Sequence, residues 1–241
     1  MVTVVRFLVL ALMLSGEFIA CKAEKPAEQK KPAPVAVVKP KNAVLTDEQR
    51  SELGFAPDVI SQMELAAGAD AEPFFGTVLM KTENLKGDQG FESKKLAGFS
   101  VRTTNGDELI DSYRASLRSR GYLIFKSQRG YGHVRDIVTI IKGGNSYDVL
   151  KTQRTEAPGY QLDTTAIIAW LKARQQEGAF VVTGAGPDWL EARFIKPPKQ
   201  LLPFARKIAA FAPDVLAHGP KTTEKLVERM ERSNGFYLVW D

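Results

Sequence analysis

From about residue 44 onward, the apolar and polar positions of the chain follow the periods of short helices and strands. Apolar residues three and four positions apart, together with local capping signals, predict helices. The predicted helices cover residues 46–53, 57–67, 105–120, 163–177, 202–210 and 222–233. Runs of β-branched and aromatic residues between turn signals predict strands. The predicted strands cover residues 73–81, 99–103, 122–125, 136–142, 147–151, 179–182, 188–195 and 236–240, and residues 82–95 are expected to form a loop.

The order helix, glycine, strand, hairpin occurs twice along the chain. Gly121 and Gly178 follow the two helices at equivalent places, and Tyr113 and Trp170 precede them at the same offset. This pattern predicts an α+β fold with a mostly antiparallel sheet, helices packed on one face, and two repeated α-β-β units. We divide the folded chain into an N-terminal part, 44–158, and a C-terminal part, 159–241, and leave open whether these are one domain or two.

Cys21 is the only cysteine of the chain and follows an apolar N-terminal run. Residues 1–20 have the layout of a secretory signal peptide, with Arg6, an apolar centre and a small residue, Ala20, before the cysteine. The pattern is similar to a bacterial lipoprotein signal, which predicts cleavage before Cys21 and lipid attachment to it. The alternative is ordinary cleavage near Ala23, which would discard the cysteine. Lys22 favours sorting to the periplasmic face of the outer membrane.

Residues 21–43 are expected to form the lipidated cysteine and a tether rich in proline, lysine and alanine. Such a segment buries too little apolar surface to fold and forms an extended spacer. Residues 22–43 contain six lysines and two glutamates, so they supply +4 of the net charge of +5 and leave +1 for residues 44–241. The folded part therefore has no charge excess of the kind that nucleic-acid binding requires.

The C-terminal part carries a series of residues in a distinctive order. They are the helix with Trp170, Gly178-Ala179, Asp188-Trp189, Pro197-Pro198, Phe204-Ala205, Phe211 to Val215 with Pro213 and Asp214, Gly219, and the final Trp240-Asp241. In this order and spacing, residues 160–241 resemble the bacterial family called domain of unknown function 4253. Members often have cysteine where this chain has Ala212, so a thiol role is excluded here. The resemblance implies no activity.

Asp214, His218 and Asp241 form the sharpest candidate cluster for chemistry. Asp214 and His218 are four residues apart and share a face if the turn after Pro213 is helical. A carboxylate and an imidazole so placed can act as a general acid–base pair. The competing interpretation is structural, because an aspartate in the first turn of a helix caps free N–H groups.

The remaining motifs give no sign of a metal site or a phosphate-binding loop. The chain has two histidines, His133 and His218, which are expected on separate loops. Because a zinc site needs three or four ligands close together, we expect no metal site and no cofactor. Gly184 to Pro187 lacks the Lys-Ser/Thr pair of a phosphate loop and is expected to be a hairpin turn. The loop from Lys126 to Arg135 combines basic residues with Tyr131. It is either a solvated hairpin connection or a surface that faces a partner.

These features predict a non-enzymatic lipoprotein of the bacterial cell envelope, attached to the membrane through Cys21. Its folded part would bind a protein or peptide partner, for example in protection against a toxin, or would act in envelope assembly. The alternative is an envelope hydrolase or lyase that uses Asp214 and His218. The sequence leaves the partner and the oligomeric state open.

Overall fold

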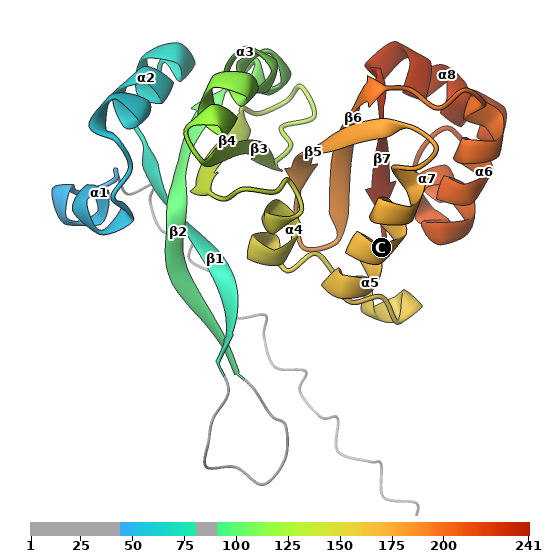
Figure 1. The fold of residues 1–241 in the computed structure, drawn as a ribbon, viewed down its shortest axis with the longest axis horizontal. Helices are drawn as coiled ribbons and strands as arrows, with labels where there is room; N and C mark the ends of the chain where they lie inside the picture. Colours follow the sequence, from blue (N-terminus) through green and yellow to red (C-terminus); the bar gives the residue numbers. More distant parts are fainter. Residues whose placement is uncertain (1–43, 81–90) are drawn as a thin grey trace, which may run out of the picture. The chain divides into compact units, whose positions relative to one another are not determined.

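The computed structural model describes residues 44–80 and 91–241. The predicted leader, Cys21 and the tether lie outside these residues. All described residues belong to one compact unit, which Figure 1 shows as a ribbon. Within this part of the chain, no helix has the length and apolar character that a membrane crossing requires.

All six predicted helices are present, and two short helices and one 3₁₀ turn join them. The helices are α1 (Asp47–Leu53), α2 (Pro57–Ala67), α3 (Gly106–Ser119), α4 (Asp148–Gln153), α5 (Thr164–Arg174), α6 (Leu201–Phe211), α7 (Asp214–Ala217) and α8 (Thr223–Ser233), with the 3₁₀ turn at Pro158–Tyr160. The strands are β1 (Glu72–Met80), β2 (Phe91–Thr103), β3 (Tyr122–Gln128), β4 (Asp136–Lys142), β5 (Ala179–Ala185), β6 (Trp189–Lys196) and β7 (Gly235–Val239).

The strands form one sheet in the order β1-β2-β4-β3-β5-β6-β7. Every neighbouring pair is antiparallel except β3 and β5, which are parallel and share a single bridge between Lys126 and Gly184. The predicted α+β class with a mostly antiparallel sheet is confirmed. The N-terminal and C-terminal parts therefore contribute to the same sheet, and among the described strands this bridge is the one strand pairing between them.

The two repeated units, α3-β3-β4 and α5-β5-β6, are present and face each other across the β3–β5 contact. A two-fold rotation about an axis along the strands would exchange them and would also exchange the two faces of the sheet. Accordingly, α3 packs with Ile124 on one face, whereas α5 packs with Phe125 on the other. The expectation that all helices cover one face is wrong, because this symmetry places the two repeated helices on opposite faces.

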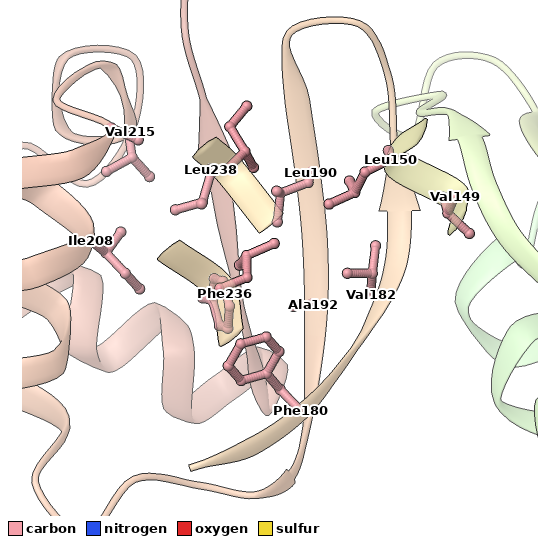
Figure 2. Close-up of a cluster of buried hydrophobic side chains, with 14 of the residues drawn as sticks. Val149, Leu150, Phe180, Val182, Leu190, Ala192, Ile208, Val215, Phe236 and Leu238 are labelled. Carbon is pink, nitrogen blue, oxygen red and sulfur yellow. The ribbon is translucent and has the colours of Figure 1, made fainter. Parts of the chain in front are cut away.

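A large cluster of buried apolar side chains fills the space between β5–β7 and the helices α5 to α8. Figure 2 shows Leu190 and Ala192 of β6 beside Phe236 and Leu238 of β7 in this cluster. All four are at most 4% exposed. Because side chains alternate along a strand, the intervening residues of β6 and β7 must point to the opposite face.

Two assignments made from sequence are wrong, one of a strand and one of a loop. Residues 147–151 were expected to be a strand, but most of them belong to helix α4. The Asn145 side chain accepts the N–H of Tyr147 at 3.0 Å, and Asp148 accepts the N–H of Asn145 at 3.1 Å. These side-chain hydrogen bonds bend the backbone into the start of a helix.

The expected loop at residues 82–95 is also partly wrong. Residues 91–95 extend β2, where they pair with β1. Residues 82–90 lie outside the described residues.

Candidate functional site

One face of β6 and β7 is the most distinctive surface of the described chain. It carries Trp189, Glu191 and Arg193 of β6 and Tyr237 of β7, whose neighbours along each strand point into the core. The helices α5 to α8 pack against the core side. We call the four residues named here, together with Arg129 and Tyr131 of the β3–β4 loop, the binding face.

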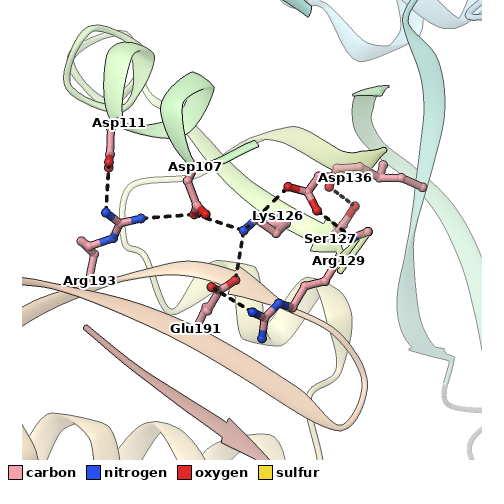
Figure 3. A network of polar contacts seen from close by, with 10 residues as sticks. Asp107, Asp111, Lys126, Ser127, Arg129, Asp136, Glu191 and Arg193 are labelled. Atoms are coloured by element: carbon pink, nitrogen blue, oxygen red, sulfur yellow. Dashed lines mark hydrogen bonds and ion pairs between the residues drawn. The ribbon is translucent and has the colours of Figure 1, made fainter. Parts of the chain in front are cut away.

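Lys126 lies beneath the binding face and is paired with carboxylates at its border. Its side chain is only 4% exposed, and its Nζ lies 3.1 Å from Asp107, 3.5 Å from Glu191 and 3.9 Å from Asp136. Figure 3 shows these carboxylates converging on the ammonium group from α3, β6 and β4. A buried charge is tolerated only when it is paired in this way. The network therefore fixes β3 against β6 at the one place where the two half-sheets meet.

Gly184, the bridge partner of Lys126, makes room for this network. A Cβ atom at this position would lie 3.0 Å from Oε2 of Glu191 and 3.1 Å from the Trp189 ring. Glycine is therefore the residue that lets both side chains cross β5 without displacement.

Arg193 extends the network to α3. Its guanidinium donates to Asp107 at 3.1 Å and to Asp111 at 3.2 Å (Figure 3). Asp107 thus accepts hydrogen bonds from both Lys126 and Arg193. These two hydrogen bonds of the Arg193 guanidinium hold the first turns of α3 at the border of the binding face.

Arg129 lies between two tyrosine rings. Its guanidinium carbon is 5.1 Å from the centre of the Tyr131 ring and 4.6 Å from that of Tyr237. Glu191 pairs with the same guanidinium at 3.9 Å. Burial, followed by the interaction with the Tyr131 hydroxyl, raises the pKa of Tyr237, so its hydroxyl stays protonated. The Tyr131 ring is 68% exposed, which leaves one side of the stack open to solvent.

A pocket of about 330 Å³ opens beside this stack. Arginines from three elements line it, namely Arg129, Arg193, Arg229 and Arg232, together with the carboxylates Asp107 and Glu191. Arg229 of α8 lies over the Tyr237 ring at 5.9 Å. Four guanidinium groups against two carboxylates give the lining a net positive charge, which favours a negatively charged ligand.

The cluster predicted from sequence, Asp214, His218 and Asp241, does come together on the surface. Oδ2 of Asp214 accepts the Asp241 N–H at 2.9 Å and the Tyr160 hydroxyl at 2.7 Å. The backbone bond from Asp241 and then the Tyr160 bond lower the pKa of Asp214. His218 lies 3.6 Å from the Asp241 carboxylate, and these two side chains are 57% and 76% exposed.

This geometry differs from the structural interpretation of Asp214 as a helix cap. The carboxylate makes no capping hydrogen bond to its own helix α7, but it fixes the C-terminus through the Asp241 backbone. Its hydrogen bond also raises the pKa of the Tyr160 hydroxyl, which makes that group a poorer nucleophile. Among the described residues, no group of three or more histidines and carboxylates is placed to hold a metal ion.

The remaining residues of the family series lie at the ends of α7, in the core or on the binding face. Pro213 precedes α7, and Gly219 follows it directly after His218. Trp240 is buried, and its Nε1 donates to the Phe211 carbonyl at 3.2 Å. Trp189 is half-buried on the binding face, and the centre of its ring lies 6.0 Å from that of Tyr237.

The sequence pointed to the loop with Tyr131 but missed the strand residues of the binding face. Glu191 and Arg193 alternate with the apolar Leu190, Ala192 and Phe194 along β6. That alternation marks one side of β6 as polar. It does not reveal that Tyr237 and Arg129 lie beside it, because those contacts are made in the folded state only.

Comparison with known protein families gives a match to the C-terminal part of the chain. Residues 137–241 match the model of a domain of unknown function, DUF4253. No curated protein and no solved structure matches the chain. The resemblance seen in residues 160–241 is thus confirmed for the C-terminal part, and the matched segment begins earlier, inside β4. It includes Glu191, Arg193 and Tyr237, whereas Asp107, Lys126 and Arg129 come from outside it.

Proposed function

We propose that this protein is a lipid-anchored component of the bacterial cell envelope whose binding face docks a protein or peptide partner. The observation that carries the proposal is the stack of Tyr131, Arg129 and Tyr237 beside an arginine-lined pocket. Tyrosine, tryptophan and arginine are the residues that dominate the binding energy of protein interfaces. Here the underlying network already holds the stack in position, so little ordering is needed on binding.

The location rests on the sequence around Cys21. Acyl chains on this cysteine would anchor the chain stably, because each buried CH₂ contributes about 0.8 kcal/mol. The tether would then hold the binding face away from the membrane surface. One concrete role is interception of a toxin as it reaches the envelope; a role in envelope assembly uses the same face.

The anchor is tested by mass spectrometry of the protein extracted from membranes. We expect acyl chains on an N-terminal Cys21, and we expect Cys21→Ser to leave the membrane fraction. Cleavage near Ala23, with a free N-terminus and no lipid, would contradict the anchor without affecting the binding face.

The binding face is tested by affinity capture from envelope extract with the whole chain in detergent. We expect one stoichiometric partner, which Tyr131→Ala loses because a stacked aromatic anchor is removed. Leu65→Ala is the matched control, since Leu65 of α2 is 84% exposed and lies outside the binding face. A partner retained equally by both variants would refute docking at this face.

A second candidate function is hydrolysis or elimination by Asp214, His218 and Asp241. The observation in its favour is that the three residues form one exposed cluster. In this mechanism His218, oriented by Asp241, would act as the general base. Loss of a hydrolytic activity in Asp214→Asn and His218→Gln, with partner capture unchanged, would support the enzyme over the binding module.

A further inference from the structure

The outer edge of β7 has free backbone hydrogen-bonding groups in its centre, between Gly235, whose carbonyl accepts the Ser233 hydroxyl, and Asp241, whose N–H donates to Asp214. β7 is the last strand of the sheet and pairs only with β6. Phe194 N–H donates to the Asn234 carbonyl and Trp240 N–H to the Asp188 carbonyl, at 2.8 and 3.0 Å. Hydrogen-bonded pairs alternate along an antiparallel ladder.

This alternation assigns the direction of each backbone group of β7. Phe236 and Leu238 bond to β6, whereas the N–H and C=O groups of Tyr237 and Val239 point away from the sheet. Within the described chain, no hydrogen bond reaches these outward groups of Tyr237 or Val239. Such an edge is a template for an added strand.

The surroundings of this edge differ on its two sides. On the side of the binding face lie Arg129 and Arg229, both over the Tyr237 ring. On the helix side, the wall of the pocket is apolar and closed, formed by Val215, Leu226 and Met230, which are at most 2% exposed. An added strand would present alternate side chains to these two sides, so it requires acidic residues at one set of positions and apolar residues at the other.

Arg229 and Arg232 supply the charge that such a strand would meet. Both line the pocket, and no carboxylate of the described residues lies within ion-pairing distance of either one. In contrast, Arg193 of the same pocket is fully engaged by Asp107 and Asp111. The unpaired arginines are therefore available to carboxylates of a partner, with which they form strong charge-assisted hydrogen bonds.

We infer that β7 receives an extended acidic segment of a partner protein as an additional strand. The segment alternates acidic and apolar residues, with its carboxylates on Arg229 and Arg232 and its backbone on Tyr237 and Val239. This inference rests on the proposed partner-binding function and specifies the chemistry and the place of the contact.

The probe is a fluorescent eight-residue peptide of alternating valine and glutamate, titrated into the whole chain by fluorescence anisotropy. We expect it to bind, and we expect the corresponding valine–lysine peptide not to bind. The double variant Arg229→Ala/Arg232→Ala should weaken binding of the glutamate peptide roughly tenfold or more. Equal binding of the two peptides, or no binding of either, overturns the inference.

The backbone contact is tested by Val239→Pro with Val239→Ala as its control. Proline removes only an outward N–H, so the ladder with β6 is preserved. We expect Val239→Pro to weaken peptide binding roughly tenfold, since a strand hydrogen bond is lost and the opposing carbonyl is left unpaired, whereas Val239→Ala stays within about twofold. Equal affinities of the two variants overturn strand addition.

Amide hydrogen exchange of the unaltered protein gives a test that does not depend on a variant. The peptide should slow exchange at Tyr237 and Val239 and leave Phe236 and Leu238 as they were. Protection confined to another strand overturns the inference. If Tyr131→Ala loses the envelope partner while Val239→Pro keeps it, the binding face remains and strand addition at β7 alone fails.

Discussion

Lys126 shows how a single charged side chain can determine the geometry of a surface. It directly follows the buried apolar residues Leu123, Ile124 and Phe125 of β3, and three carboxylates compensate its charge. Replacing only the lysine of such a group leaves the negative charge of the carboxylates less compensated. Lys126 therefore controls both the stability of the half-sheet contact and the position of Glu191 beneath Arg129.

Lys126→Ala is expected to lower the free energy of unfolding by about 3 kcal/mol, since it takes the ammonium group away from the largely buried carboxylates of Asp136 and Glu191. Urea denaturation measures this change. Arg120→Ala is the control, because the Arg120–Asp58 pair is short, at 2.7 Å, but lies on the surface, where such pairs contribute little. Similar losses in the two variants would show that the burial of Lys126 is unimportant.

Asp214 is expected to give the protein a pH-dependent stability. Its hydrogen bonds lower its pKa below the ordinary value of 3.8 in the folded state. A lowered folded-state pKa stabilises the fold above the unfolded pKa, and this stabilisation is lost as the pH falls through the folded pKa. Asp214→Asn should flatten the acid side of the stability profile below about pH 4, as measured by thermal unfolding. An unchanged slope would contradict the role of the carboxylate.

Among the elements, the helix starts were predictable where a side chain closes the first turn. Thr46, Asp163 and Thr222 all accept backbone N–H groups at the starts of α1, α5 and α8. Helix α4 was not predicted because its start depends on the hydrogen bonds that the side chains of Asn145 and Asp148 accept from nearby backbone N–H groups. In addition, its buried residues Val149 and Leu150 are adjacent in sequence and do not have helical spacing. The extended β2 was missed because its polar residues gain their order from pairing with β1.

Capping should have a measurable effect at one helix and none at another. The Asp163 carboxylate accepts the Ala166 N–H at 2.7 Å, so Asp163→Ala should cost about 1 kcal/mol of stability. Asn105 stands at the start of α3 but makes no side-chain cap. Asn105→Ala should therefore leave the urea midpoint nearly unchanged, and an equal shift at both positions would disprove the assignment.

At the scale of the whole molecule, the two repeated units are joined by few backbone contacts and many side-chain contacts. β3 and β5 share one bridge, but Leu123 and Phe125 of β3 pack in the same cluster as Phe180 of β5. The sequence predicted the repeat and not its symmetry, because periodicity shows which side of a helix is apolar but not which face of the sheet it covers. The binding face was unpredictable for the same reason.

A chain reduced to the family-matched residues 137–241 is expected not to fold cooperatively. It lacks β3, which covers the β5 edge, and it lacks Lys126, the partner of Glu191. We expect a broad urea transition by circular dichroism for this fragment and a single sharp transition for the chain from residue 44. A sharp transition of the fragment would show that the matched segment is an autonomous domain.

The division of the charge network between the matched segment and the rest of the chain has an evolutionary consequence. Arg193 lies inside the segment, whereas its partners Asp107 and Asp111 lie outside it. A substitution on one side would then be tolerated only with a compensating one on the other. Among relatives that keep both regions, these positions should covary, and the regions should be inherited together and not exchanged by recombination at their border.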